Sequence, residues 1–336
     1  MDLIAVIVAA ALAAFLLTGA ARRYAVRAKL LDIPNARSSH DVPTPRGGGL
    51  SIVVTVLVAL PVLWWWGALP GSVLAALWPG AAAVAAVGWI DDHADVPAAA
   101  RLVVHLLAGV WVVWRSGGLP LLPLPETTLS LGVAGGVIGV LFVGWLINLY
   151  NFMDGIDGIA GIEVVTVGVV AAWLIGQGGN SGLSLVLAVL SAASLGFLVW
   201  NWPPAKIFMG DAGSGFVGVL LASLALVTSN AVGMNFWAWL ILLGVFIVDA
   251  TVTLVRRLLR GERVYQAHRS HAYQHAARRY GSHLPVTCAV GGINLVWLAP
   301  LAYAAVRWPQ AGVAFLVVSW VPLLYIALRF RAGLPG

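Results

Sequence analysis

Asn148-Leu-Tyr-Asn-Phe-Met-Asp-Gly-Ile-Asp-Gly-Ile-Ala-Gly161 is a polar stretch that separates two strongly apolar runs, residues 129–147 and 160–176. Apolar runs of this length are typical of helices that cross a lipid bilayer. A membrane-spanning chain keeps ionisable side chains beside such helices mainly where they pair, bind an ion or do chemistry. The pattern therefore predicts a membrane protein with functional groups at the ends of its helices.

Within this stretch Asn148, Asn151, Asp154 and Asp157 recur at every third residue. A continuous helix would place their polar ends roughly on one face, and the interleaved glycines allow a phosphate or another backbone to come close. Asn and Asp are also common at helix ends, so the alternative interpretation is a polar loop that caps two helices. The repeated spacing favours a functional site.

The composition of the whole chain supports an integral membrane protein. Of 336 residues, 61% are hydrophobic and 10% are charged, and the mean hydropathy is +0.94, which excludes an ordinary soluble domain. The formal charge of +6 does not indicate nucleic-acid binding, because the basic residues are spread between apolar segments and form no extended stripe. The apolar segments of spanning or near-spanning length are 2–20, 50–68, 73–90, 101–115, 129–147, 160–176, 182–199, 214–231, 236–255, 285–305 and 310–328.

We therefore predict an all-α integral membrane protein with about eleven transmembrane helices. It forms one domain, residues 1–336, with the functional motifs in 34–275 and two terminal helices in 285–328. Lys and Arg are enriched in cytoplasmic connections, and all 19 of them except Arg115 and Arg307 fall at one end of the predicted bundle. The prediction is an N-terminus outside, a C-terminus in the cytoplasm, and every polar motif on the cytoplasmic face.

Two motifs in the first half of the chain suggest anion and cation binding. Pro43-Thr-Pro-Arg-Gly-Gly-Gly49 resembles a turn whose amides cradle a phosphate, although Arg46 could equally be an orienting charge. Asp91, Asp92 and Asp95 crowd three carboxylates at one helix end, where like charges repel unless a cation joins them. Mg²⁺ shared with substrate phosphates is the natural partner, and a solvated helix end is the alternative.

A glycine-rich turn in the second half has similar chemistry. Lys206-Ile-Phe-Met-Gly-Asp-Ala-Gly-Ser-Gly215 places Asp211 before an apolar run, where it is a candidate ligand for a metal that bridges a pyrophosphate. Phe208 is a candidate for stacking on a nucleobase, with packing as the alternative. Asp249 and Arg256 are seven residues apart and are expected to pair across two helical turns, in a structural role.

His268, His271 and His275 have the spacing of one helical face. Such a row could bind a metal. The neighbouring Arg269 favours a row of phosphate-binding donors instead. A basic amphipathic segment lying on lipid headgroups is the alternative.

Together these motifs resemble the polyprenyl-phosphate N-acetylhexosamine-1-phosphate transferase family, integral membrane enzymes that start bacterial cell-wall and O-antigen lipid intermediates. The resemblance covers nearly the whole chain, from Pro34 to about Gln274. The family's last motif is often a tighter His-x-His or triple His, and His-Arg-Ser-His here looks closest to the O-antigen branch that uses fucosamine- or quinovosamine-type sugars. The motifs that carry the resemblance are Pro43-Thr-Pro-Arg-Gly-Gly, Asp91-Asp-x-x-Asp95, Asn148-x-x-Asn-x-x-Asp-Gly-x-Asp-Gly158, Phe208-Met-Gly-Asp-x-Gly-Ser214 and His268-x-x-His271.

The resemblance implies that a UDP-N-acetylhexosamine donates its sugar-1-phosphate to undecaprenyl phosphate and releases UMP. It implies a multi-pass protein of the bacterial inner (cytoplasmic) membrane that starts O-antigen or related glycan assembly. The implied cofactor is Mg²⁺, for which Mn²⁺ could substitute, with Asn151 and Asp211 as ligands. The implied partners are the two substrates and the bilayer, without nucleic acid, and a homodimer is compatible with them.

The resemblance also implies roles for individual side chains. Asp91 and Asp92 orient or deprotonate the lipid phosphate, Asp154 and Asp157 line the nucleotide pocket, and the histidine motif neutralises phosphate charge. The implied catalytic residues are Asp91, Asp92, Asp154, Asp157, His268 and His271. The implied substrate-binding residues are Arg46, Asn148, Asn151, Lys206, Phe208 and Arg269.

Two other classes of function are consistent with a polytopic chain. A transporter would also carry acidic residues within the membrane, but it predicts them near the bilayer midplane rather than at helix ends. A non-catalytic membrane scaffold has no need for acidic and histidine motifs at one face. An assay distinguishes both alternatives from a transferase, because only a transferase releases UMP when the UDP-sugar and the lipid phosphate are both present.

Overall fold

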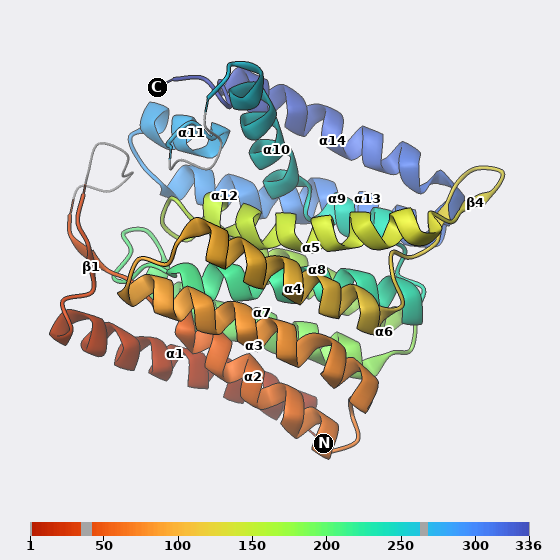
Figure 1. The fold of residues 1–336 in the computed structure, drawn as a ribbon, viewed down its shortest axis with the longest axis horizontal. Helices are drawn as coiled ribbons and strands as arrows, with labels where there is room; N and C mark the ends of the chain where they lie inside the picture. The colour runs from red at the N-terminus through yellow and green to blue at the C-terminus, as the bar shows by residue number, and fades with distance from the viewer. Residues whose placement is uncertain (1, 35–41, 263–267, 336) are drawn as a thin grey trace.

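The computed structural model describes residues 2–34, 42–262 and 268–335, and its architecture is a bundle of helices (Figure 1). Two short antiparallel hairpins accompany the helices, β1 (Leu31–Asp32) with β2 (Thr44–Pro45) and β3 (Leu122–Pro123) with β4 (Thr128–Leu129). The helices are α1 (Leu3–Arg27), α2 (Leu50–Trp65), α3 (Gly71–His93), α4 (Ala98–Ser116), α5 (Gly132–Met153), α6 (Ile159–Gln177), α7 (Ser181–Asn201), α8 (Asp211–Ala231), α9 (Phe236–Leu242), α10 (Gly244–Leu259), α11 (Ala272–Tyr280), α12 (Leu284–Ile293), α13 (Ala299–Arg307) and α14 (Gly312–Arg329).

The predicted all-helical class is confirmed, and each of the predicted apolar segments contains a helix. Within the described residues, nine helices are long and apolar enough to cross a membrane, and ten if α9 and α10 are counted as one broken span. The sequence predicted about eleven. The difference arises because α2 has only 16 residues and because the predicted 236–255 helix bends by 75° at Leu243.

Helix α8 is the centre of the bundle, and 94% of its most apolar 18-residue stretch is buried. It packs against α3 and α5. Small residues let these helices approach closely: a Cβ on Gly218 would lie 2.6 Å from the Leu146 carbonyl oxygen of α5, and one on Gly88 of α3 would lie 2.6 Å from the Asp211 carbonyl oxygen. The first residue of α8, Asp211, is therefore placed by direct backbone packing.

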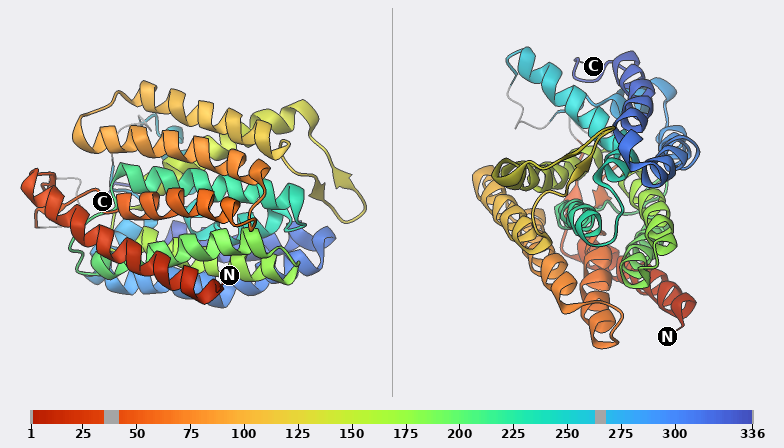
Figure 2. Two further views of the ribbon diagram at one scale, coloured as in Figure 1. Left: turned by 90° about the horizontal axis from the view of Figure 1, so that it is seen from below. Right: turned by 90° about the vertical axis from the view of Figure 1, so that its right-hand side faces the viewer.

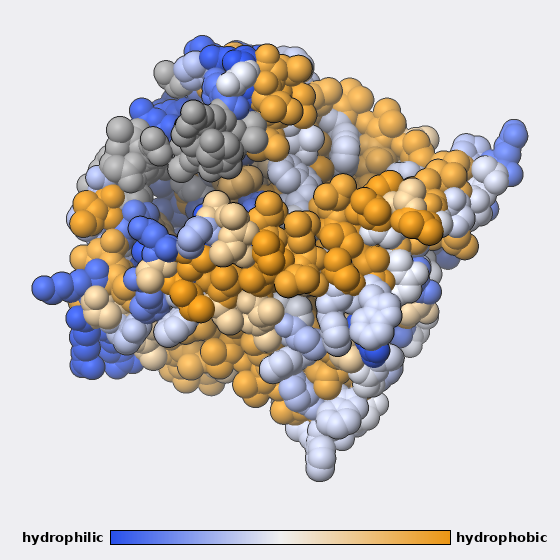
Figure 3. All heavy atoms as spheres, in the orientation of Figure 1, coloured by the Kyte–Doolittle hydropathy of each residue, from blue (hydrophilic) through white to orange (hydrophobic). Residues whose placement is uncertain are grey.

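The outer surface of the bundle is apolar, as a lipid-facing surface must be. Leu107 and Val110 of α4 and Leu141 of α5 are more than half exposed. Figure 3 shows hydrophobic side chains across the middle of this face and hydrophilic ones gathered at the end where β1 lies. The protein is therefore a multi-pass membrane protein.

The connections that carry the polar motifs meet at one end of the bundle. Figure 1 shows β1, α11 and the C-terminus at this end and the N-terminus at the other, and the side view in Figure 2 shows the helices running between the two ends. Helices α3, α5 and α7 end here and α4, α6 and α8 begin here. Which side of the membrane this end faces stays a prediction.

Candidate active site

The stretch 148–158 does not continue as a helix, so the prediction that its four polar residues share one helical face is wrong. Helix α5 ends at Met153, and Asp154 and Asp157 lie in the turn before α6. Gly158 has a φ of +76°, and a Cβ there would lie 3.1 Å from the Thr287 methyl group and 3.3 Å from Pro203. A residue with left-handed backbone and such close neighbours must be glycine. This conformation is not helical, so α5 does not continue through the turn into α6.

The two asparagines of this stretch remain on α5 and point to different partners. The Asn151 amide donates to Asp211 Oδ1 at 2.6 Å and lies 3.4 Å from Ser214 Oγ. The Asn148 amide donates to the Gly144 carbonyl at 2.7 Å and lies 3.4 Å from His105 Nδ1. Asn151 thus connects α5 to the first turn of α8.

Arg101 brings two of the predicted acidic residues together. Its guanidinium donates to Asp91 Oδ2 and lies 3.3 Å from Asp211 Oδ2. Asp91 also accepts a hydrogen bond from the Val96 amide at 2.8 Å. Residues from α3, α4, α5 and α8 therefore meet at one cluster, and a cation already lies between its carboxylates.

Asp92 is buried, with 4% of its surface exposed. Its carboxylate accepts the Asp211 amide at 3.0 Å and the Ala212 amide at 3.2 Å, so it caps the N-terminus of α8. Arg46 donates to the Asp92 backbone carbonyl at 2.8 Å. Asp92 and Arg46 therefore have observed positioning roles, while their contacts with substrate stay predictions.

The glycines of the 43–49 motif pack against backbone instead of presenting their amides to an anion. The Gly48 amide donates to the Phe208 carbonyl and the Gly49 amide to the Met209 carbonyl, both at 2.8 Å. A Cβ on Gly49 would lie 2.6 Å from Gly213 Cα. The prediction of a phosphate-cradling turn is therefore wrong for these two amides, and the glycines serve close approach to the 208–213 turn.

A groove of about 510 Å³ leads from the apolar surface to the Asp211 cluster. Helices α3, α4, α5, α8 and α10 all contribute to its lining. Apolar side chains form most of it, among them Leu102, Leu106 and Leu141. Its polar lining residues are Arg101, His105, Asn148, Asn151 and Asp211. The groove therefore joins an apolar channel to a small charged cluster, which suits an amphiphile with an anionic head.

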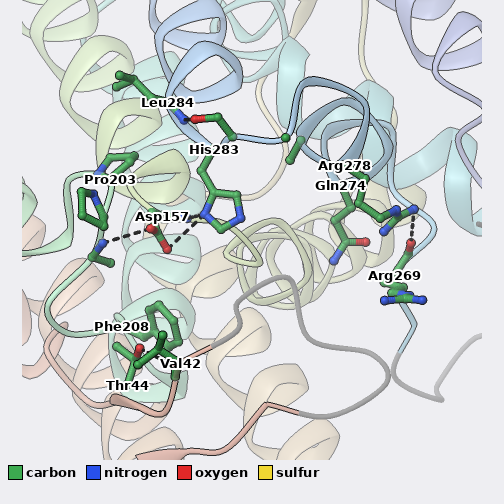
Figure 4. Close-up of a pocket in the computed structure, with 15 residues that line it drawn as sticks. Val42, Thr44, Asp157, Pro203, Phe208, Arg269, Gln274, Arg278, His283 and Leu284 are labelled. Atoms are coloured by element: carbon green, nitrogen blue, oxygen red, sulfur yellow. Dashed lines mark hydrogen bonds and ion pairs between the residues drawn. The ribbon is translucent and has the colours of Figure 1, made fainter.

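A second cavity, of about 750 Å³, lies at the same end of the bundle (Figure 4). Asp157 lies on its wall, where it accepts the Ala205 amide at 2.9 Å and lies 3.2 Å from His283 Nδ1. Phe208 lies below Asp157 in this view, beside Val42 and Thr44. The basic residues Arg269 and Arg278 line another part of the cavity. An aromatic ring and cationic side chains in one cavity can bind a base and phosphates.

The histidine motif is not a row on one helical face, which corrects that prediction. His268 precedes α11 and His271 is its N-cap residue. The two rings stack with centroids 4.9 Å apart, while His275 bonds to the Leu334 carbonyl at 3.1 Å. His271 is buried, and its Nδ1 lies 3.3 Å from Asp249 Oδ1.

Asp249 anchors the start of α11 and does not pair with Arg256 as predicted. Its carboxylate accepts the Ala272 amide at 2.9 Å and the Tyr273 amide at 3.0 Å, besides its contact with His271. Arg256 donates instead to the Ala332 carbonyl at 2.9 Å. Asp249 therefore caps α11 and orients His271.

In the chain, Asp154 lies between Phe152, which lines the groove, and Asp157, which lines the second cavity. Burial, together with the negative charges of Asp211, Asp92 and Asp157, raises the pKa of the Asp154 carboxyl well above its ordinary value. A carboxyl group in this state gains most from a nearby cation. Below this raised pKa the Asp154 carboxyl is protonated and neutral, and a bound cation would favour its ionised form.

Two predicted substrate-binding residues lie away from the Asp211 cluster. The Lys206 ammonium lies over the Trp200 ring at 5.8 Å and is exposed. Arg269 is exposed at the rim of the second cavity, where its carbonyl accepts a hydrogen bond from Arg278 at 3.1 Å. Their contact with substrate stays a prediction.

The donor set at Asp211 fits a hard divalent cation with few protein ligands. Within residues 2–34, 42–262 and 268–335, no three His, Cys, Asp or Glu side chains are placed to hold a metal together. Mg²⁺ in phosphoryl-transfer sites commonly uses one or two carboxylates together with substrate phosphates and water. Asp211 supplies one such carboxylate, the Asn151 amide adjoins it at 2.6 Å, and the Arg101 guanidinium lies 3.3 Å from it.

Three residues of this region were missed as site residues by the sequence reasoning. Arg101 was counted only as a topological charge, Asp249 was paired with the wrong arginine, and His283 was not considered. Their partners lie 110, 22 and 126 residues away in sequence. A charged residue near one end of an apolar run was the available signal for Arg101 and Asp249.

The chain is similar to known transferases along most of its length. The family model described as "Glycosyl transferase family 4" matches residues 74–229. A probable undecaprenyl-phosphate N-acetylglucosaminyl 1-phosphate transferase of Bacillus subtilis is 27% identical over 323 residues, which cover 93% of this chain and 88% of the relative.

Two further relatives agree. A putative glycosyltransferase of Streptomyces coelicolor is 33% identical, covering 74% of this chain and 67% of the relative. An undecaprenyl-phosphate alpha-N-acetylglucosaminyl 1-phosphate transferase of Thermotoga maritima is 26% identical, covering 81% of each. The chain belongs to glycosyl transferase family 4, among the polyprenyl-phosphate N-acetylhexosamine-1-phosphate transferases.

Proposed function

We propose that this protein transfers an N-acetylhexosamine-1-phosphate from a UDP-sugar to undecaprenyl phosphate and releases UMP. The observation that carries the proposal is the pairing of two different cavities at one end of the bundle. An apolar groove reaches Asp211 from the lipid-facing surface, and a larger cavity of mixed polar and apolar lining, next to Asp157, opens at the same end. A lipid acceptor and a soluble nucleotide donor need such a pair.

The groove suits the polyprenyl phosphate. Its apolar lining accommodates isoprenoid units, and its polar end places Arg101 and Asn151 where a phosphate head would arrive. Arg101 is held by Asp91 and Asp211, so it is oriented before substrate binds. Orientation of this kind contributes to phosphoryl transfer, where positioning and charge neutralisation supply most of the catalysis.

The second cavity suits the nucleotide sugar. Phe208 offers a ring for the uracil base, and Arg269 and Arg278 offer cationic groups to the pyrophosphate. Asp157 is fixed between the Ala205 amide and His283, so its carboxylate is held in one orientation on the cavity wall. The segment 154–157 connects this cavity to the Asp211 cluster.

In the proposed reaction an oxygen of the lipid phosphate forms a bond to the β-phosphorus of the UDP-sugar, and the bond from that phosphorus to the bridging oxygen breaks. UMP leaves with the bridging oxygen. Asp211 and Asn151 would hold Mg²⁺, which when bound neutralises charge on the pyrophosphate. Arg101 holds the acceptor phosphate, and His268, Arg269 and His271 neutralise the charge of the donor phosphates.

The test uses the purified chain in detergent with undecaprenyl phosphate and a panel of UDP-sugars that includes UDP-N-acetylglucosamine and N-acetylated 6-deoxyhexoses. We expect UMP release that requires both substrates, and we expect Asp211→Asn to lower it by at least about 100-fold while the protein still inserts and purifies normally. The panel also tests the O-antigen-type sugar that the histidine motif suggests.

The matched control is Asp95→Asn, which changes a neighbouring exposed carboxylate. Wild-type turnover in Asp211→Asn would refute the assigned role. UMP release without a lipid acceptor would contradict transfer, and substrate flux into proteoliposomes without UMP release would favour a transporter.

A further inference from the structure

The segment that follows α14, residues 330–335, folds back against the histidine motif. The Gly333 amide donates to the Ser270 carbonyl at 2.7 Å, and Ser270 stands between Arg269 and His271 in the chain. Ala332 is fully buried. A chain segment more than sixty residues away in sequence therefore holds the backbone of the motif.

Helix α10 holds the same segment from its other side. Arg256 Nη1 donates to the Ala332 carbonyl at 2.9 Å, and Arg260 Nη1 lies 3.3 Å from the Gly333 carbonyl. A Cβ added to Gly333 would lie 2.8 Å from Arg256 Cβ and 2.8 Å from the Thr253 carbonyl oxygen. Gly333 also has a φ of +74°, so both its conformation and its surroundings require glycine.

A further contact reaches the segment from α11. Arg278 lies 3.0 Å from His275 Nδ1, and His275 Nε2 lies 3.1 Å from the Leu334 carbonyl. An arginine can only donate, so Nδ1 accepts and the Nε2 proton is directed to Leu334. Burial and the Arg278 charge lower the pKa of the His275 imidazole, which favours this neutral tautomer.

We propose that residues 330–335 position the phosphate-binding segment 268–271, with Gly333, Arg256 and His275 as the positioning residues. The geometry that carries this is the three-sided contact of the segment with Ser270, with α10 and with α11. Helix α10 also supplies Asp249, which orients His271. The segment thus adds to the support that Asp249, Gln274 and Arg278 give this loop.

This inference rests on the proposed function, because it assigns the segment's purpose through His268, Arg269 and His271. Residues 268–270 lie outside α11 and His271 is its N-cap residue. Charged side chains that bind phosphates must be held in place to be effective. Positioning by a remote segment therefore affects the reaction without contact with substrate.

The test compares Gly333→Ala with Gly179→Ala in the full chain. Both glycines have positive φ values, +74° and +82°, but a Cβ on Gly179 meets nothing within 4 Å. Hydrogen–deuterium exchange is measured at the amides of residues 271–275, together with kcat and KM for UDP-sugar. For Gly333→Ala we expect exchange at these amides to accelerate about tenfold and kcat/KM to fall about tenfold, with neither change in Gly179→Ala.

A second pair of variants covers the case in which Gly333→Ala does not fold. Arg256→Met removes the donor to Ala332 and is expected to accelerate the same exchange about fivefold, whereas Arg256→Lys retains a donor and is expected to restore most of the protection.

Unchanged exchange at residues 271–275 in folded Gly333→Ala or Arg256→Met overturns the inference, and so does accelerated exchange with unchanged turnover. Absence of UMP release from the wild-type chain refutes the proposed function instead, and is seen before any variant is compared.

Discussion

Gly88→Ala tests whether the position of Asp211 depends on the contact between α3 and α8. A Cβ on Gly88 would lie 2.6 Å from the Asp211 carbonyl oxygen and 2.7 Å from the Ala212 nitrogen, whereas ordinary contact begins at 3.4 Å. The opposing atoms belong to the backbone and cannot rotate away, so the two helices must separate by about 0.8 Å. Overpacking of this kind typically lowers the free energy of unfolding by about 1–3 kcal/mol.

The displacement falls on the residue that is proposed to hold the metal and to anchor Asn151. A misplacement of roughly 1 Å at a reacting centre can cost about 100-fold in rate, so we expect turnover to fall by about 10- to 100-fold. Steady-state UMP release and the thermal unfolding midpoint are measured in detergent.

Gly80→Ala is the matched control, since it lies on the same helix and its Cβ meets only side-chain and carbonyl atoms at 3.5 Å or more. We expect it to leave turnover unchanged and to stabilise slightly, because alanine is the better helix former. Wild-type turnover in Gly88→Ala, or an equal loss in Gly80→Ala, would refute the reasoning.

Three further predictions concern Asp249, the metal ion and Asp154. Asp249→Asn keeps the size of the side chain but weakens the cap on α11 and the contact with His271, so kcat/KM should fall about tenfold. The control Thr253→Val loses only a hydroxyl group and should change kcat/KM little; equal effects would contradict the assignment. EDTA should stop UMP release and Mg²⁺ or Mn²⁺ should restore it, and undiminished release in chelator would count against metal binding by Asp211 and Asn151. The pKa of Asp154 is raised in the folded protein, so its contribution to stability is present at low pH and is lost as pH rises above the ordinary carboxyl pKa of about 4. Over that rise the unfolding midpoint of the wild type should fall more than that of Asp154→Asn; parallel curves would show that Asp154 is not perturbed.

The helical bundle could be predicted from the sequence because bilayer-spanning helices have a length and composition that few other structures share. What the apolar pattern does not encode is a break inside a hydrophobic segment. Leu243 separates two helices at 75° without a proline or a charge, and α2 ends at Trp65 although apolar residues continue. These features depend on packing with other helices.

The sequence was enough to predict which residues form the site and that they lie together. It was not enough to predict which side chains they contact. The Asp91, Asn151 and Asp211 cluster follows from acidic and amide residues at helix ends that face the same way. The cation that joins them, Arg101, has the same sequence signature as an orienting charge. Its role is decided by side-chain geometry across 110 residues.

Glycine motifs were the least reliable guide. The 43–49 motif has the composition of an anion-binding turn, but its amides bind the backbone at 208–209. Glycine allows close approach of any group, and the sequence does not say whether that group is a phosphate or a polypeptide. By contrast, the interruption of α5 after Met153 could have been expected from Gly155 and Gly158.

The most direct test of the account follows the β-phosphate of a UDP-sugar labelled with ³²P at that position. If the protein is a sugar-1-phosphate transferase, the label must appear in the lipid fraction in equal amount to the UMP released, and both must disappear in Asp211→Asn. Label that stays in a soluble uridine nucleotide while the sugar moves to the lipid would contradict the account, since it would show transfer of the sugar alone.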